Sequence, residues 1–182
     1  VLDKRPGCDM TQLLRNWGLT FLGNMGGAIT VAFLASFILT FGFDTDGGTI
    51  AAKVGTIGEA RTLGYQSHGV SGWFTIFVRG MLCNWMVSMG VVGAMISTSA
   101  TGKMLAMYMP VMLFFYMGFE HSIVNMFLFP FSMIMGGDFT VADYLIWNEL
   151  PTVLGNLVGG LVFVGLPLYF THVRTRPSRK LA

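Results

Sequence analysis

The chain has 182 residues, of which 53% are hydrophobic and 11% are charged, and its formal net charge is +2. Soluble domains carry about 25% charged residues, so this composition, with a mean hydropathy of +0.64, indicates a polytopic membrane protein and excludes disordered and nucleic-acid-binding classes. The two cysteines, Cys8 and Cys83, provide neither a disulfide framework nor a metal-binding spacing.

Five stretches of the chain contain no Asp, Glu, Lys or Arg: 16–43, 80–102, 104–119, 121–137 and 150–173. A helix needs about 20 apolar residues to cross a bilayer. The third and fourth stretches are each too short, and only Glu120 separates them. We therefore predict a single all-α transmembrane domain over residues 1–182, a polytopic helical bundle. Its expected spans are 16–41, 73–97, a broken helix over 105–136 that is interrupted near 118–122, and 150–172.

The basic residues predict the orientation of these four spans. Four crossings place both termini on one side, together with eight bases: Lys4, Arg5, Arg15, Lys103, Arg174, Arg176, Arg179 and Lys180. The other side has Lys53 and Arg61 and six acids: Asp44, Asp46, Glu59, Asp138, Asp143 and Glu149. Cytoplasmic loops are enriched in Lys and Arg. We therefore expect a multi-pass protein of the plasma (inner) membrane with cytoplasmic termini, an outer segment at 44–72, and Arg79 snorkelling near the outer end of its span.

A repeated pattern links the first and last spans. Residues 22–27 (LGNMGG) and 154–159 (LGNLVG) share the spacing L-G-N-x-x-G, with the small residues Gly23 and Gly27, and Gly155 and Gly159, four positions apart. Either motif alone is explained by close helix packing. Together they run in opposite directions across the membrane, as in an inverted repeat, with Asn24 and Asn156 in matching positions. The repeat predicts a six-helix protein, of which this sequence contains four helices.

The unusual chemistry lies in the broken helix, where Glu120, His121, Ser122 and Asn125 follow Gly118 within an apolar run. An ionised acid near the bilayer centre costs about 2.5–3.5 kcal/mol on an insertion scale, so such groups face protein or water. A helix that starts near Ser122 would direct its free N–H groups and its positive dipole end at the midplane, which favours an anion. The structural alternative is that His121 only links helices and that the acid is neutral or paired with Arg79 or an Asn.

Several ordered motifs resemble the formate/nitrite transporter family. Residues 118–126 (GFEHSIVNM) are similar to its G-F/Y-E-H-S-I/V-x-N-M signature, and residues 79–87 (RGMLCNWMV) to its R/K-G-I/A/M-L-C-N-W-L/M-V segment. The two L-G-N-x-x-G motifs match its third and sixth helices. The resemblance extends from about Asn16 to Leu168.

The resemblance implies a homopentamer of six-helix protomers with an aquaporin-like inverted repeat, each protomer with its own pore for a small monovalent anion or its conjugate acid. By motif position, His121 would be the central pore histidine and Glu120 its supporting acid. Asn125 and Asn84 would be polar groups near the histidine, and Val87 and Phe114 would fall at hydrophobic constrictions. The family's first two helices are missing, and neither Lys53 nor Arg61 aligns with a vestibule lysine, so we assign these two residues no role.

These residues predict a channel or transporter for formate or nitrite, and not an enzyme. An anion that crosses an apolar constriction loses several kcal/mol of solvation, whereas a neutral acid loses much less. An unperturbed imidazole titrates at about pH 6.5, so His121 could hold the anion or exchange a proton with it. Other small solutes, such as hydrosulfide, lactate or a neutral molecule, remain alternatives.

A membrane-anchored redox subunit is the competing class. A haem needs paired axial ligands, and His68 and His172 lie too far along the chain from His121 to share one. We predict no cofactor and no metal, and we expect the basic C-terminal run to be solvated or to contact lipid headgroups.

Overall fold

The computed structural model describes residues 9–174, which form helices joined by short connections. In chain order the elements, with η for a π-helical stretch, are α1 (Met10–Leu39), α2 (Gly48–Arg61), α3 (Leu63–Gln66), α4 (Gly69–Ile96), α5 (Ala100–Tyr116), α6 (Ser122–Ile134), α7 (Val141–Tyr144), η1 (Leu145–Glu149), α8 (Leu150–Gly160), η2 (Leu161–Gly165), α9 (Leu166–Leu168) and η3 (Tyr169–Arg174). The predicted all-α fold class is confirmed.

Three described helices are long and apolar enough to cross a membrane: Met10–Leu39, Gly69–Ile96 and Val141–His172, and α6 is a shorter apolar helix. The last one begins at Val141, well before the predicted start at 150. Thr140 caps it, because its hydroxyl accepts a bond from the Asp143 N–H while the Asp143 carboxylate accepts one from the Thr140 N–H. This reciprocal capping satisfies two donors at the helix start. Glu149 therefore lies inside this helix and not in the connection before it, where the predicted start at 150 had placed it.

The predicted break in the third span is present between Tyr116, where α5 ends, and Ser122, where α6 begins. Gly118 turns the chain with φ +63°, a left-handed conformation that glycine adopts without a steric penalty. The Arg79 guanidinium on α4 donates a hydrogen bond to the Gly118 carbonyl oxygen. Arg79 therefore satisfies a backbone carbonyl group at the break, a role that the sequence pattern did not assign to it.

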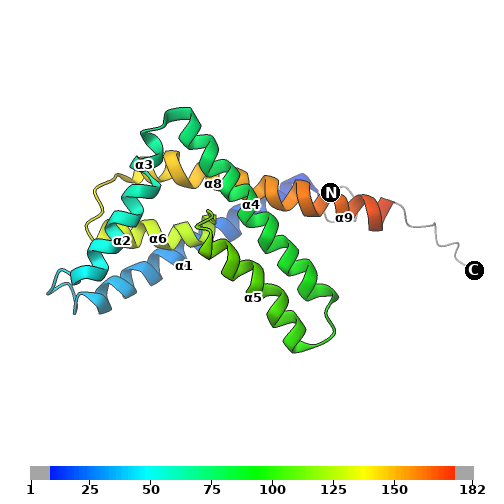
Figure 1. The fold of residues 1–182 in the computed structure, drawn as a ribbon, viewed down its shortest axis with the longest axis horizontal. Helices are drawn as coiled ribbons and strands as arrows, with labels where there is room; N and C mark the ends of the chain where they lie inside the picture. The colour runs from blue at the N-terminus through cyan, green and yellow to red at the C-terminus, as the bar shows by residue number, and fades with distance from the viewer. Residues whose placement is uncertain (1–8, 175–182) are drawn as a thin grey trace, which may run out of the picture.

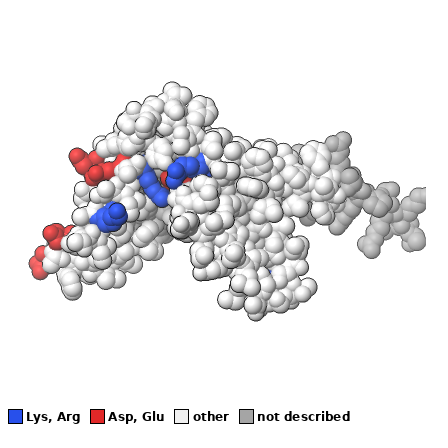
Figure 2. Space-filling view, viewed as in Figure 1, with Lys and Arg blue, Asp and Glu red and all other residues white. Residues whose placement is uncertain are grey.

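The expected outer segment at 44–72 is largely helical, formed by α2 and α3. Gly58 of α2 lies so close to α6 that an added Cβ would collide with the Ser132 side chain. Ser132 in turn donates to the Val54 carbonyl oxygen at 3.0 Å. The Asp138 N–H donates to the Glu59 carboxylate at 2.9 Å. The end of α2 and the connection after α6 thus meet at one end of the molecule, where the charged atoms visible in Figure 2 also gather.

Two groups of helices meet at the break (Figure 1). The helices α4 and α5 form an antiparallel hairpin on one side, and α1 and α2 pack against α6 on the other. The long helix that contains α8 runs past both groups and makes its most extensive contact with α4. A small aromatic core of Phe129, Phe139 and Tyr144 joins α6 to the start of this helix, and the Phe129 and Tyr144 rings stack at 4.7 Å.

Candidate functional site

His121 occupies the N-cap position of α6, at the centre of the break. Its backbone is extended (φ −122°, ψ 117°), and its carbonyl oxygen accepts the first helical bond, from the Asn125 N–H at 2.9 Å. The N–H groups of the first helical turn have no acceptor within the helix. The structure thus places an imidazole and the positive end of α6 at one point, as predicted.

The imidazole of His121 stacks on Phe114. The two ring centroids are 5.8 Å apart, and Phe114 is only 3% exposed. The Nδ1 atom of His121 is buried and has no hydrogen-bond partner among the residues that the structure describes. Since buried polar atoms are almost always hydrogen-bonded in proteins, this unpartnered nitrogen marks the histidine as a candidate functional group. Phe114, predicted by counting back from the signature, does lie beside the histidine.

The carboxylate of Glu120 is completely buried and is held by two kinds of partner. Its Oε2 accepts a hydrogen bond from Asn125 Nδ2 at 3.0 Å and lies 3.6 Å from Arg61 Nη1. Glu120 and Asn125 are therefore in contact. This agrees with the alternative in which the acid is paired with an asparagine. The absence of a role for Arg61 is an error, because Arg61 supplies the cation that offsets this buried charge.

Asn156 of α8 ties three backbone segments together. Its Oδ1 accepts from the Ser122 N–H at 3.0 Å, and its Nδ2 donates to the carbonyl oxygens of Gly80 and Glu120 at 2.9 and 3.0 Å. Asn84 Nδ2 donates to the carbonyl oxygen of Asn156 at 2.6 Å. The asparagine of the second repeat motif thus anchors the break to α4, which gives it a role beyond helix packing.

Two further residues that the sequence motifs do not single out as site residues, Asn148 and Glu149, belong to this cluster. The completely buried Asn148 donates to Glu120 Oε2 at 3.4 Å and to the Arg61 carbonyl oxygen at 3.0 Å, and its Oδ1 accepts from Asn125 at 2.6 Å. Asn148 precedes Asn156 by two helical turns, on the same face. This spacing was a signal in the sequence, but the predicted helix start at 150 concealed it.

The remaining predicted residues do not join this cluster. Val87 is half-buried on α4. Gly23 and Gly27 are exposed on α1, where an added Cβ would meet nothing within 4 Å. Asn24 lines a shallow groove of about 680 Å³ with Ile123 and side chains of α1 and α8. The bases of the topology prediction at the extreme ends of the chain lie outside the described residues: Lys4, Arg5, Arg176, Arg179 and Lys180.

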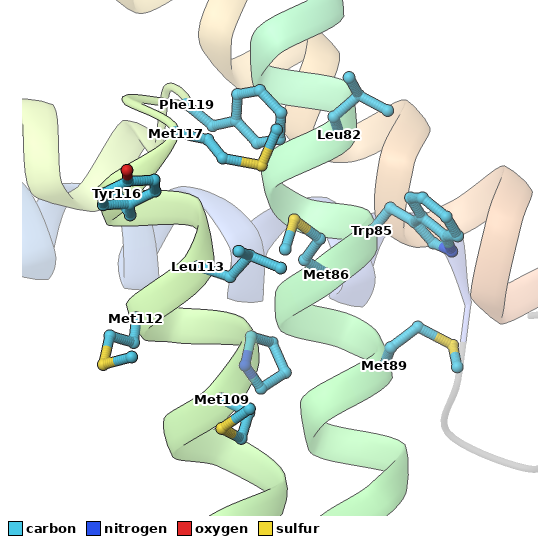
Figure 3. A pocket seen from close by; sticks show the side chains of 11 residues that line it. Leu82, Trp85, Met86, Met89, Met109, Met112, Leu113, Tyr116, Met117 and Phe119 are labelled. Carbon is cyan, nitrogen blue, oxygen red and sulfur yellow. The ribbon is translucent and has the colours of Figure 1, made fainter.

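A second, larger groove of about 890 Å³ lies between α4 and α5. Figure 3 shows its lining, in which Met86 of α4 and Leu113 of α5 lie between the two helices and Phe119 lies at one end. Neither His121 nor any asparagine of the polar cluster lines it. This groove is a hydrophobic surface suited to hydrocarbon or apolar side chains, and the chemistry is concentrated at the break instead.

The chain is similar to several known proteins. The family model described as formate/nitrite transporter matches residues 1–170. The chain is 34% identical to a probable formate transporter of Methanothermobacter thermautotrophicus, over 96% of this chain and 64% of that protein, and 31% identical to the formate channel FocA of Haemophilus influenzae, over 86% and 58%. The chain thus spans about three fifths of the length of these relatives. A solved pentameric formate channel with formate bound matches with a TM-score of 0.73 and 27% identity, over 91% of this chain and 68% of that one. The chain belongs to the formate/nitrite transporter family.

Proposed function

We propose that this protein passes small monovalent weak-acid anions, formate or nitrite, across a membrane in a pH-dependent manner. The observation that carries the proposal is the position of His121 at the N-terminus of α6, with a buried Nδ1 that has no partner among the described residues. An imidazolium and a helix N-terminus both favour a negative charge at the same point. The relatives described as formate transporter and formate channel support the choice of substrate class.

The proposed role of the histidine follows from the cost of desolvating an ion. An isolated anion in an apolar passage loses several kcal/mol or more, and protonation removes most of this cost. Phe114, stacked on His121, would supply an apolar wall next to the imidazole, and Val87 a second one on α4. We propose that His121 stabilises the anion or gives it a proton, with Glu120, Asn125 and Asn84 supporting the histidine.

We also propose a homopentamer in the plasma (inner) membrane with cytoplasmic termini. The pentameric formate channel that matches this fold supports the assembly. The hydrogen bond from the Asp138 N–H to the Glu59 carboxylate brings α2 and the connection after α6 together. The excess of Lys and Arg predicted on the opposite side supports an outer location for this end.

The open glycine face of α1 supports a proposal about the architecture. Gly23 and Gly27 have free space where their counterparts on α8 touch α4. We propose that α1 closes an earlier repeat unit, whose other two helices belong to a part of the gene product outside residues 1–182.

The test is flux of formate and nitrite into liposomes that contain the complete gene product, measured over the pH range in which histidine titrates. We expect His121→Ala to lower flux and to change its pH profile. His68→Ala is the matched control, because His68 is exposed in the connection before α4 and should leave the profile unchanged. An unchanged profile in His121→Ala would remove the histidine from the mechanism, and the absence of any flux would refute the proposed function.

A further inference from the structure

A second carboxylate, that of Glu149, is buried beside the break. Glu149 is 3% exposed and lies within the membrane-length helix Val141–His172. Its Oε1 accepts a hydrogen bond from the Ser122 hydroxyl at 2.7 Å, and its Oε2 accepts one from the Tyr144 hydroxyl at 3.0 Å. Ser122 directly follows His121 in the chain. The Glu149 carboxyl is therefore bonded to the residue next to the histidine.

The partners of Glu149 differ from those of Glu120. Glu120 pairs with Arg61 and accepts from two amide groups, whereas both partners of Glu149 are neutral hydroxyls. Among the residues that the structure describes, no cation pairs with Glu149. An ionised carboxylate that is buried without a cation costs several kcal/mol, and a neighbouring like charge raises that cost. Glu120 is such a neighbour, because Asn148, the residue before Glu149, bonds to it.

The charged and titratable side chains on the elements that pack against η1 do not change this balance. The helices α6 and α8 contain none. The other elements and the break contribute Tyr65 of α3, Arg79 and Cys83 of α4, Glu120 and His121 of the break, and Asp143 and Tyr144 of α7. Arg79 bonds to the Gly118 carbonyl oxygen and lies over the Tyr65 ring at 5.9 Å, and Asp143 bonds to Thr140 at the helix start. The two cations are thus engaged elsewhere, Arg79 at Gly118 and Arg61 at Glu120.

We propose that Glu149 is a second proton-binding site next to His121, and that its charge limits the passage of anions. The second half of this statement rests on the proposed function. When Glu149 holds a proton, Arg61 balances the remaining charge on Glu120. When Glu149 releases the proton to solvent, one unbalanced negative charge remains beside the point where the anion meets the histidine, and like charges repel. Flux should then fall at alkaline pH for a reason that is separate from the titration of His121.

Infrared spectroscopy tests the proton-binding half without any transport. The carbonyl stretch of a protonated carboxylic acid is recorded as a function of pH for the complete gene product in lipid. We expect a buried carboxylic acid band that titrates in the unmodified protein and is absent in Glu149→Gln. Asp44→Asn, which removes an exposed acid from the connection after α1, should leave the band unchanged. If Glu149→Gln does not fold, Glu149→Asp keeps the carboxyl group and should move the band rather than remove it.

Formate flux tests the second half. We expect Glu149→Gln to raise the ratio of flux at about pH 8 to flux at about pH 6 several-fold over the unmodified protein, with no change in Asp44→Asn. A band that persists in Glu149→Gln, or that does not titrate, overturns the proton site. An unchanged flux ratio overturns its control of anion passage. Failure of the proposed function is distinct, because an unmodified protein without flux would still show the titrating band.

Discussion

The helices α1 and α8 carry the same L-G-N-x-x-G pattern in very different surroundings. On α8, a Cβ added to Gly155 or Gly159 would collide with backbone carbonyl oxygens of Phe77 and Met81 on α4. On α1, the same addition at Gly23 or Gly27 meets nothing within 4 Å. Asn156 makes three hydrogen bonds across the break, whereas Asn24 makes none to the described residues.

This difference shows what the pattern encodes. Glycines four residues apart form a flat strip that admits another helix backbone, and the asparagine between them satisfies backbone groups that a broken helix leaves free. On α8 both functions are in use: the backbone of α4 packs on the glycine strip, and the Asn156 side-chain amide bonds to backbone groups at the break. The pattern therefore specifies two neighbours, a straight helix and a broken helix. Because α1 carries the same pattern, we expect it to need the same two neighbours.

The largest expected effect is the loss of stability when a glycine of either strip is replaced by leucine. Gly159→Leu should cost more than about 4 kcal/mol, because the new side chain would meet backbone that cannot rotate away. We expect failure to recover a folded oligomer of the complete gene product by size-exclusion chromatography in detergent. Under the proposed repeat, Gly27→Leu should fail in the same way.

The Gly27→Leu variant tests whether the α1 glycine strip is also packed against a helix in the complete protein. A Gly27→Leu variant that folds and assembles normally would show that the α1 strip stays open, and it would contradict the proposed repeat. Gly26→Leu is the control on the same helix, since the pattern places Val158 at the corresponding position of α8.

The asparagines give the next largest difference. Asn156→Leu leaves the Ser122 N–H and the carbonyl oxygens of Gly80 and Glu120 without their partner. Each unsatisfied buried group costs about 1–3 kcal/mol, and relaxation at the break should keep the total near the low end, at about 3 kcal/mol. Thermal denaturation of the purified oligomer measures this loss. Asn24→Leu should be equally destabilising if a broken helix lies beside α1, and a stability equal to that of the unmodified protein would contradict this.

The spans and the break could be predicted from the sequence because both follow from local chemistry. Uncharged length determines which segments can cross a bilayer, and Gly118 followed by adjacent polar residues interrupts a helix wherever it packs. The inverted pattern also identified Asn24 and Asn156 before any contact was known. These features depend on residues that are close together in the chain.

The charge partners could not be predicted, because they depend on packing between distant segments. Arg61 reaches Glu120 only because α2 lies against α6. The sequence pattern assigns Glu149 to a connection because this acid directly precedes the uncharged stretch at 150–173. Its carboxylate bonds to Ser122 on α6, a separate helix, as well as to Tyr144, which lies five residues earlier in the same long helix. A buried acid and a loop acid look alike in a sequence until their partners are known.

The smallest expected effect compares a glycine at the break with one on the open helix. Gly118 has φ +63°, and an added Cβ would lie 3.1 Å from Arg79 Nη2. A left-handed conformation costs a residue with a Cβ about 1–2 kcal/mol, so Gly118→Ala should lower the free energy of unfolding by that amount. Gly26→Ala, inside α1 with no atom near its Cβ, should instead raise it by about 0.5–1 kcal/mol, because alanine loses less backbone entropy in a helix.

Unfolding of the complete gene product in mixed detergent micelles measures both alanine variants under one condition. The Gly118 change should also alter the pH profile of formate flux, because Arg79 and the Gly118 carbonyl oxygen hold the turn that presents His121. The Gly26 change should leave that profile intact. Equal stability of the two variants would mean that the turn relaxes to a conformation that alanine accepts. The break would then be a flexible connection, and its polar groups would owe their positions to Asn156 alone.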